Sequence, residues 1–182
     1  RFVVAHLGTG ITIGVHCGGK IIDVIGAKAD GPFSPERAGG LPVGELVDLI
    51  FSGKYTEAEL KKKLLSGWGL VAYLGTRDIR EVFKIAENDP EASIVLEAFV
   101  YQIAKGIGEL CTVLDGEIDS VILTGGMAHS DRLMEMLLKK IKFLAPIVII
   151  PGENELEALY KGAERILLKE ERPRLYPGGE YI

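Results

Sequence analysis

The sequence is poor in cysteine, in basic charge and in long apolar runs, and each shortage excludes a class of protein. Two cysteines in 182 residues, Cys17 and Cys111, do not make a disulfide scaffold and favour reduced thiols in a cytoplasmic protein. Lysine and arginine number 21 against 26 acidic residues, for a net charge of −5, so nucleic acid is not an expected partner. No apolar run reaches the length of a membrane span, so a membrane is not an expected partner either.

Three short segments rich in β-branched residues open the sequence, at 2–6, 11–17 and 20–25. They are joined by two glycine turns, LGTG (7–10) and CGGK (17–20). Turns of this composition suit type I′ or II′ hairpins, which connect antiparallel strands. The opening of the chain is therefore predicted to be a three-stranded antiparallel sheet.

A helical region is predicted next, after a proline- and glycine-rich loop at 30–42. Long ordered loops in compact domains are usually functional. Thr56 and Glu59 have the spacing of a capping box at the start of one helix, and Pro90 suits the first turn of the longest one. Helices are expected at 43–51, at 56–65, from about 78 onward and from 90 to about 114.

Two glycines interrupt the longest predicted helix. Gly106 and Gly108 each cost roughly 1 kcal/mol relative to alanine in a helix interior. Close packing against another element would explain such a cost, so we expect close neighbours at both positions.

The element order as a whole indicates a fold. The remaining sequence alternates between strands and helices, with strands at 120–123 and 147–150 and helices at 131–142 and 154–168. The resulting order β-β-β-α-β-α-β-α is that of the ribonuclease-H-like fold, which actin-like ATPases use. We expect an α/β domain with a mixed sheet, in which three antiparallel strands precede parallel strands and helices flank the sheet. The domain is predicted to span 1–168, with a helical insertion at about 43–115 and an irregular tail at 169–182.

Two glycine turns are candidates for binding phosphate. Glycines let backbone N–H groups face a phosphate without a Cβ in the way, and Thr9 adds a hydroxyl to LGTG. The second turn, TGGM (124–127), follows a strand and precedes a helix, where backbone amides and the helix dipole favour a nucleotide. A plain hairpin turn and a tight connection with Ser130 as N-cap are the alternatives. The GxGxxG spacing of a Rossmann dinucleotide site is absent.

Five segments carry a family resemblance: AHLGTGITIGVHCGGKIIDV, GPFSPERAGGLPVGEL, SGWGLVAYLGTRDIREV, LTGGMAH and PGENELEAL. In this order they resemble motifs of the acetate and butyrate kinases, and of the butyrate kinases most closely. That family is built of two actin-like halves, and the resemblance covers essentially the whole chain as the second, C-terminal half. A start directly in a strand and without methionine fits this, so we expect a fragment whose N-terminal half is missing.

The first two motifs imply the phosphate contacts and the catalytic residue. The residues against the β- and γ-phosphates of ATP would be His6, Gly8, Thr9 and Gly10. Arg37 would be the catalytic arginine, because a planar fork of donors can neutralise charge on the transferring phosphoryl group. The alternative is a structural Arg37, paired with Glu36 or with a helix end.

The later motifs imply the nucleoside contacts. Asp78 and Arg80 would hold the ribose and adenine; the alternative is Asp78 as N-cap of its helix with Arg80 paired to a neighbour. Gly125, Gly126 and Met127 would contact adenosine through the backbone, because this chain has Met127, Ala128 and His129 where the family often has Asn or Glu just after the glycine pair.

The last motif implies the metal ligand. Glu155 would bind Mg²⁺, which takes only one or two protein carboxylates besides phosphate oxygens and water. The match needs a one-residue slip, so Glu153 remains a second candidate. Two acidic residues in the first turn of a helix also need no metal, since they interact favourably with its dipole.

These implications define the expected function. The complete enzyme would transfer the γ-phosphoryl group of ATP to butyrate or a branched short-chain acid, giving an acyl phosphate and ADP, or run in reverse. It would be a cytoplasmic homo-oligomer, and the fragment alone would be inactive. The alternative from another class is a non-catalytic nucleotide-binding domain of the actin-like superfamily, which would need neither Arg37 nor Glu155.

Overall fold

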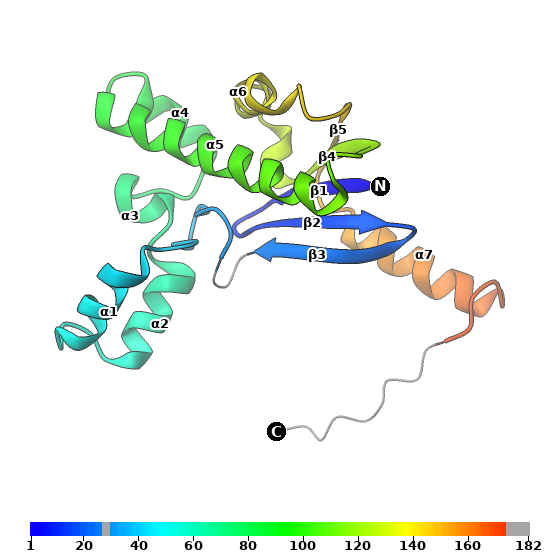
Figure 1. Cartoon of the computed structure of the whole chain (residues 1–182), viewed down its shortest axis with the longest axis horizontal. Coiled ribbons are helices and arrows are strands. Elements are labelled where there is room, and N and C mark those ends of the chain that lie inside the picture. The colour runs from blue at the N-terminus through cyan, green and yellow to red at the C-terminus, as the bar shows by residue number, and fades with distance from the viewer. Residues whose placement is uncertain (27–29, 174–182) are drawn as a thin grey trace. The chain divides into compact units, whose positions relative to one another are not determined.

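The structure is a computed structural model that describes residues 1–26 and 30–173 (Figure 1). Contacts divide the chain into two compact units, Arg1–Gly152 and Glu153–Ile182. The first unit contains the sheet and the helices up to α6, and the second contains α7 (Glu155–Leu167). Most of the predicted tail at 169–182 lies outside the described residues.

The five strands form one mixed sheet in the order β3–β2–β1–β4–β5 (Figure 1). β1 (Phe2–Leu7), β2 (Ile11–Cys17) and β3 (Lys20–Gly26) pair antiparallel. β1 also pairs in parallel with β4 (Ser120–Gly125), and β4 pairs in parallel with β5 (Ile147–Pro151). The predicted α/β class and the antiparallel start followed by parallel strands are confirmed.

Helices fill the connections between these strands. The structure has α1 (Val43–Phe51), α2 (Glu57–Ser66), α3 (Leu70–Leu74), α4 (Ile79–Ala86), α5 (Pro90–Cys111), η1 (Thr112–Leu114), η2 (Gly126–His129) and α6 (Asp131–Ile141). The predicted capping box is confirmed: Thr56 accepts from the amide of Glu59, and the Glu59 carboxylate accepts from the amide of Thr56. Asp89 caps α5, whose first turn contains Pro90 as predicted.

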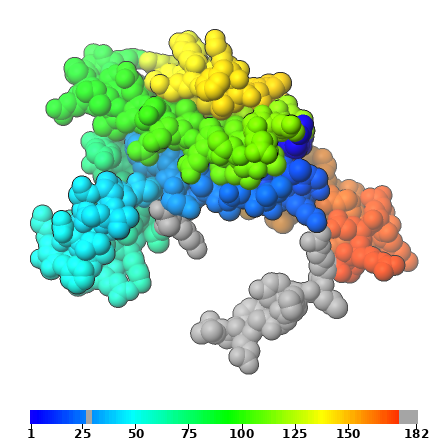
Figure 2. Space-filling model, in the orientation of Figure 1, coloured from blue at the N-terminus to red at the C-terminus, as the bar shows by residue number. Residues whose placement is uncertain are grey.

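The core lies between one face of the sheet and two helices. Alternate residues of the central strands have no exposed surface: Val3, Ala5, Leu7, Ile11, Ile13, Val15, Val121 and Leu123. They pack against buried stripes of α5 and α6, which lie side by side over the strands (Figure 2). This packing orients the other side of each strand, and the turns at the strand ends, away from the core.

The structure shows the state of the two cysteines and whether any described helix could cross a membrane. Cys17 and Cys111 are free thiols, and burial raises the pKa of the Cys111 thiol. Among the described helices, none combines the length and the apolar character that a membrane crossing requires.

The two glycine turns of the opening sheet differ from each other. In CGGK, Gly18 (φ 57°) and Gly19 (φ 76°) both have a positive φ, as a type I′ turn requires, so the prediction of a type I′ or II′ hairpin is confirmed here. In LGTG neither glycine has a positive φ, and the Gly8 amide donates to the Gly10 carbonyl at 3.2 Å across a three-residue turn. The two-residue hairpin prediction is therefore wrong for LGTG. Its glycines are needed for space and not for backbone conformation.

A short helix, α3, lies in a segment between 65 and 78 for which no helix is predicted from the sequence. Its N-cap is Gly69, which has no side chain to mark a helix start, and its C-cap is Gly75 with a left-handed φ of 70°. The two glycines read as loop residues in the sequence because they carry no periodic signal. In the structure they delimit one and a half turns of helix.

The two glycines inside α5 are packed differently. A Cβ on Gly106 would lie 2.9 Å from Ile13 Cδ1 and 3.0 Å from Ile25 Cδ1, whereas a Cβ on Gly108 would meet no atom within 4 Å. The prediction of close packing is confirmed for Gly106 and wrong for Gly108. Gly106 lets the helix approach β2 and β3 closely, and Gly108 has no such role.

We expect Gly108→Ala to raise the free energy of unfolding by up to about 1 kcal/mol, because alanine is the better helix former and the site is open. Gly106→Ala should lose stability instead, since its methyl group would crowd the two isoleucines and overpacking costs about 1–3 kcal/mol. Urea unfolding of both variants measures the difference. Equal gains would show that α5 does not approach the sheet as described.

Candidate active site

The two predicted phosphate turns meet at one edge of the sheet. β1 and β4 run in parallel with His6 opposite Thr124, so both strands end on the same side. Gly125 follows with a φ of 94°, and a Cβ at this position would lie only 2.5 Å from the carbonyl oxygen of Leu7. The TGGM turn therefore packs directly against the first residue of LGTG.

Both glycines of LGTG leave room for a side chain that carries hydrogen-bond donors. A Cβ on Gly8 would lie 3.1 Å from Nε2 of His6, and a Cβ on Gly10 would lie 2.7 Å from Cζ of Arg37. The guanidinium thus lies over the backbone of the turn, although it comes from a loop 27 residues further along the chain. His6, the turn and Arg37 therefore lie close together.

Arg37 has no ion pair within residues 1–26 and 30–173, although it is half-buried. Glu36, which the structural alternative pairs with Arg37, instead forms an ion pair with Arg77. Arginine without a carboxylate partner beside a glycine turn offers its donors to an anion that approaches the turn. The geometry therefore favours the binding role for Arg37 over the structural one.

The loop that carries Arg37 is fixed from behind by α3. The amides of Leu70 and Val71 donate to the carbonyls of Ser34 (3.0 Å) and Pro35 (3.1 Å). A Cβ on Gly69 would lie 2.6 Å from the Glu36 amide nitrogen, so only glycine permits this approach. Nothing in the sequence pattern marks Ser34 or Gly69 as important beyond their presence in glycine- and proline-rich segments.

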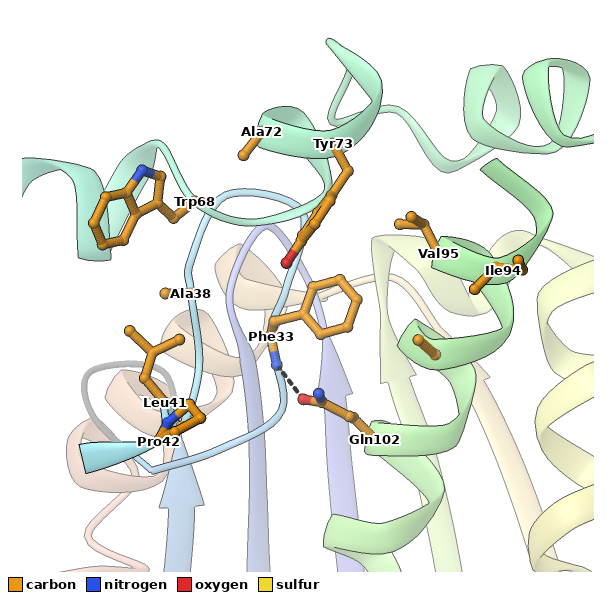
Figure 3. Close-up of a pocket in the computed structure, with 12 residues that line it drawn as sticks. Phe33, Ala38, Leu41, Pro42, Trp68, Ala72, Tyr73, Ile94, Val95 and Gln102 are labelled. Carbon is orange, nitrogen blue, oxygen red and sulfur yellow. Dashed lines mark hydrogen bonds between the residues drawn. The ribbon is translucent and has the colours of Figure 1, made fainter. Parts of the chain in front are cut away.

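An apolar pocket of about 580 Å³ opens beside the same loop (Figure 3). Phe33 lines it, packs edge to face on Phe99 and Tyr73, and donates its backbone N–H to Gln102 Oε1 at 3.2 Å. Trp68 closes another side of the pocket. No lining residue is charged and Arg37 is not among them, so the pocket suits a hydrocarbon group and not a phosphate.

Asp78 is the N-cap of α4. Its carboxylate accepts from the Arg80 amide at 2.9 Å and from the Arg80 guanidinium, whose Nη2 lies 2.6 Å away. The guanidinium, and then the amide, lower the pKa of Asp78 from 3.8 to about 2. The structural alternative for this pair is thus present in the structure, and nucleoside binding stays a prediction. The neighbouring ion pair between Arg77 and Glu36 brings the start of α4 close to the loop that holds Arg37.

The adenosine turn offers backbone and not side chains. Met127 is 8% exposed and belongs to the hydrophobic core, whereas Gly126 is exposed and a Cβ there would meet nothing within 4 Å. The burial of the Met127 side chain agrees with the expectation that this turn contacts a ligand through its backbone.

The two candidate metal ligands belong to the second unit. Glu155 begins α7 and Glu153 precedes it, and both are exposed. Within the described part of the chain, no three His, Cys, Asp or Glu side chains cluster as a metal cage. Exposed single carboxylates fit Mg²⁺ that is held mainly by phosphate oxygens and water.

A family model described as the acetokinase family matches residues 1–171. The chain belongs to the acetokinase family. It is 49% identical over 177 residues to a protein named probable butyrate kinase 2 from Caldanaerobacter subterraneus subsp. tengcongensis, covering 97% of this chain and 50% of that protein. The chain thus spans about half the length of that relative.

Two solved kinase structures have the same fold. The acetate kinase of Porphyromonas gingivalis matches with a TM-score of 0.79 and 19% identity, over 90% of this chain and 48% of that one. A propionate kinase from Francisella tularensis subsp. tularensis matches with a TM-score of 0.75 and 23% identity, over 85% of this chain and 47% of that one. These likenesses confirm the predicted actin-like fold.

We expect the stability that Asp78 contributes to depend on pH. Because the folded-state pKa is depressed to about 2, this stability is present above the ordinary pKa of 3.8 and is lost as the pH falls from about 4 to about 2. Asp78→Ala should melt at a lower temperature than the wild type at neutral pH, and the difference should shrink through this window. Asp78→Asn keeps a capping oxygen but does not titrate, so it serves as control. An unchanging difference between wild type and Asp78→Ala would contradict the assignment.

Proposed function

We propose that this chain is the C-terminal half of a short-chain fatty acid kinase. The complete enzyme transfers the γ-phosphoryl group of ATP to the carboxylate of butyrate or a branched short-chain acid, and catalyses the reverse reaction. The observation that carries the proposal is the guanidinium of Arg37, which lies over Gly10 of the hairpin turn and has no ion pair among the described residues. A non-catalytic nucleotide-binding domain would not need a cation at this point.

In this reaction the protein mainly positions the reactants and neutralises charge on the transferring phosphoryl group. A carboxylate oxygen forms the new bond to the γ-phosphorus while the bond to the β,γ-bridging oxygen breaks, and ADP leaves with the electron pair. The carboxylate is ionised at neutral pH, so no general base is required. Arg37 donates to the equatorial oxygens of the phosphoryl group, and its planar fork holds them in line.

The nucleotide lies across the two turns in this proposal. His6 and the turn of Gly8, Thr9 and Gly10 bind the β- and γ-phosphates. The backbone at Gly126 contacts the adenosine, and Asp78 and Arg80 hold the ribose and adenine. The close packing of the two turns against each other supports this arrangement, because phosphate and nucleoside sites must be fixed at one distance.

We propose that a carboxylate of the C-terminal motif PGENELEAL binds Mg²⁺. Glu155 is the proposed ligand and Glu153 the second candidate. One of these carboxylates would hold Mg²⁺, and the ion would supply positive charge for the phosphoryl transfer.

The partners and setting follow from the same assignment. The missing partner is the N-terminal half, which brings most of the acyl pocket. The complete enzyme is also proposed to be a homo-oligomer. The free thiols Cys17 and Cys111 support a cytoplasmic location.

Arg37→Ala in the full-length enzyme should lower kcat by about 10³-fold or more with little change in either KM, as for arginines in other phosphoryl transfers. Arg37→Lys should restore only part of the rate, because a point charge does not reproduce the planar fork. Arg132→Ala is the matched control: it removes an ion pair with Glu87 and a contact with the Phe83 ring, so it should lower stability and leave kcat unchanged. If Arg37→Ala behaved like Arg132→Ala, Arg37 would be structural.

Gly126→Ala should raise the KM for ATP by about tenfold, equivalent to about 1.4 kcal/mol of lost ground-state binding, and leave the KM for the fatty acid alone. The added methyl group meets no protein atom, so the fold should keep its stability. Gly108→Ala, which is equally open in α5, is the control for the substitution itself. An unchanged KM for ATP would place the nucleoside elsewhere.

A further inference from the structure

The hydroxyl of Ser34 is one of two buried polar side chains within the described residues. Ser34 is 1% exposed, and the other is Ser120 at 8%. Burying a hydroxyl is unfavourable unless hydrogen bonds compensate for it, so the partners of each serine show its role. Ser120 donates to the carbonyl of Pro146 at 2.9 Å and ties β4 to the segment before β5. Ser34 has partners at the site itself.

Ser34 joins the phosphate turn to the catalytic loop through a single oxygen atom. Its Oγ donates to the carbonyl of Thr9, the middle residue of the turn, at 2.7 Å. The same Oγ accepts from the backbone amide of Arg37 at 3.0 Å. In addition, the Ser34 amide donates to the Arg37 carbonyl at 3.0 Å, which closes residues 34–37 into a tight turn. A hydroxyl has one proton, and here it is used on the phosphate turn.

The loop is fixed on its other side by contacts that do not involve the turn. Phe33 donates its amide to Gln102 and lies against the ring of Tyr73, as Figure 3 shows. It also packs edge to face on the ring of Phe99. The carbonyl of Ser34 accepts from the amide of Leu70. The backbone at 33–35 is therefore anchored to α3 and α5, and the Ser34 hydroxyl connects this anchored backbone to the turn that carries Gly10.

We propose that Ser34 is a positioning residue for phosphoryl transfer: it sets the place of the Arg37 guanidinium relative to the phosphate turn without touching substrate. This inference rests on the proposed function, because it assigns a consequence to the position of Arg37 during the reaction. A guanidinium displaced by about 1 Å loses much of its effect on a transferring phosphoryl group, since such a misplacement can cost about 10²-fold in rate. Phosphate and nucleoside binding use other groups and are affected little.

The test compares Ser34→Ala with Ser120→Ala in the full-length enzyme. The two substitutions make the same chemical change at buried serines, so both should lower the melting temperature. Ser34→Ala should also lower kcat by about 10–100-fold, with the KM values for ATP and butyrate within about threefold of the wild type. Ser120→Ala should keep the wild-type kcat per folded molecule.

A double-mutant cycle separates positioning from other roles. If Ser34 acts through Arg37, adding Ser34→Ala to Arg37→Ala should cause no further loss of kcat, because the group to be positioned is already gone. Full additivity of the two losses would overturn the proposal. So would a Ser34→Ala enzyme that is destabilised but turns over normally.

Two further measurements, on a Ser34→Cys variant and on the wild-type enzyme, separate failure of this proposal from misfolding and from failure of the proposed function. Ser34→Cys has nearly the same volume and a weak S–H donor, so it should fold even if Ser34→Ala does not, and its kcat should fall between those of wild type and alanine variant. A thiol variant with the full wild-type kcat would overturn the proposal. Absence of acyl phosphate formation by the wild-type enzyme would overturn the proposed function itself, a result distinct from any behaviour of the Ser34 variants.

Discussion

The parallel pairing of β1 with β4 is the constraint on which the site depends. It brings two turns that are more than 110 residues apart in sequence to the same edge of the sheet, with His6 opposite Thr124. The contact between Gly125 and the backbone of Leu7 then fixes the distance between the turns, because no side chain could be inserted there. The core under α5 and α6 holds the two strands in register, so the spacing of the turns follows from ordinary hydrophobic packing.

The loop at 30–42 carries Arg37 to this edge of the sheet and holds its guanidinium at a fixed distance from the LGTG turn. Its backbone is held by α3 and by Gln102, and its Ser34 hydroxyl reaches the Thr9 carbonyl. A long loop would otherwise place Arg37 poorly, since its backbone is not part of any helix or strand. The three contacts replace the rigidity that secondary structure supplies elsewhere, which is why buried polar groups occur in a segment of this kind.

Much of the fold could be predicted from local signals in the sequence. The β-branched segments, the capping box at Thr56 and the Pro90 start of α5 each rely on neighbouring residues, so they appear in a single sequence. The approach of Arg37 to Gly10 and the bond from Ser34 to Thr9 depend on contacts between distant segments, which no periodic pattern records. Helix α3 has a glycine at each end: Gly69 allows close approach to the neighbouring loop, and Gly75 forms a left-handed cap. Local propensity predicts a loop at such glycines, so it does not indicate the helix between them.

Electrostatics distinguishes the arginine of the site from the others. Of the five arginines in residues 1–26 and 30–152, Arg1, Arg77, Arg80 and Arg132 each have a carboxylate partner, and Arg37 has none. An exposed arginine without a partner costs little, but Arg37 is half-buried against a turn, where desolvation of the guanidinium is not offset by a protein anion. The guanidinium lies against Gly10 of the turn, in an arrangement that suits an anion. In the proposed function, a bound phosphate would offset this desolvation cost, and most fully when negative charge on the transferring group is greatest.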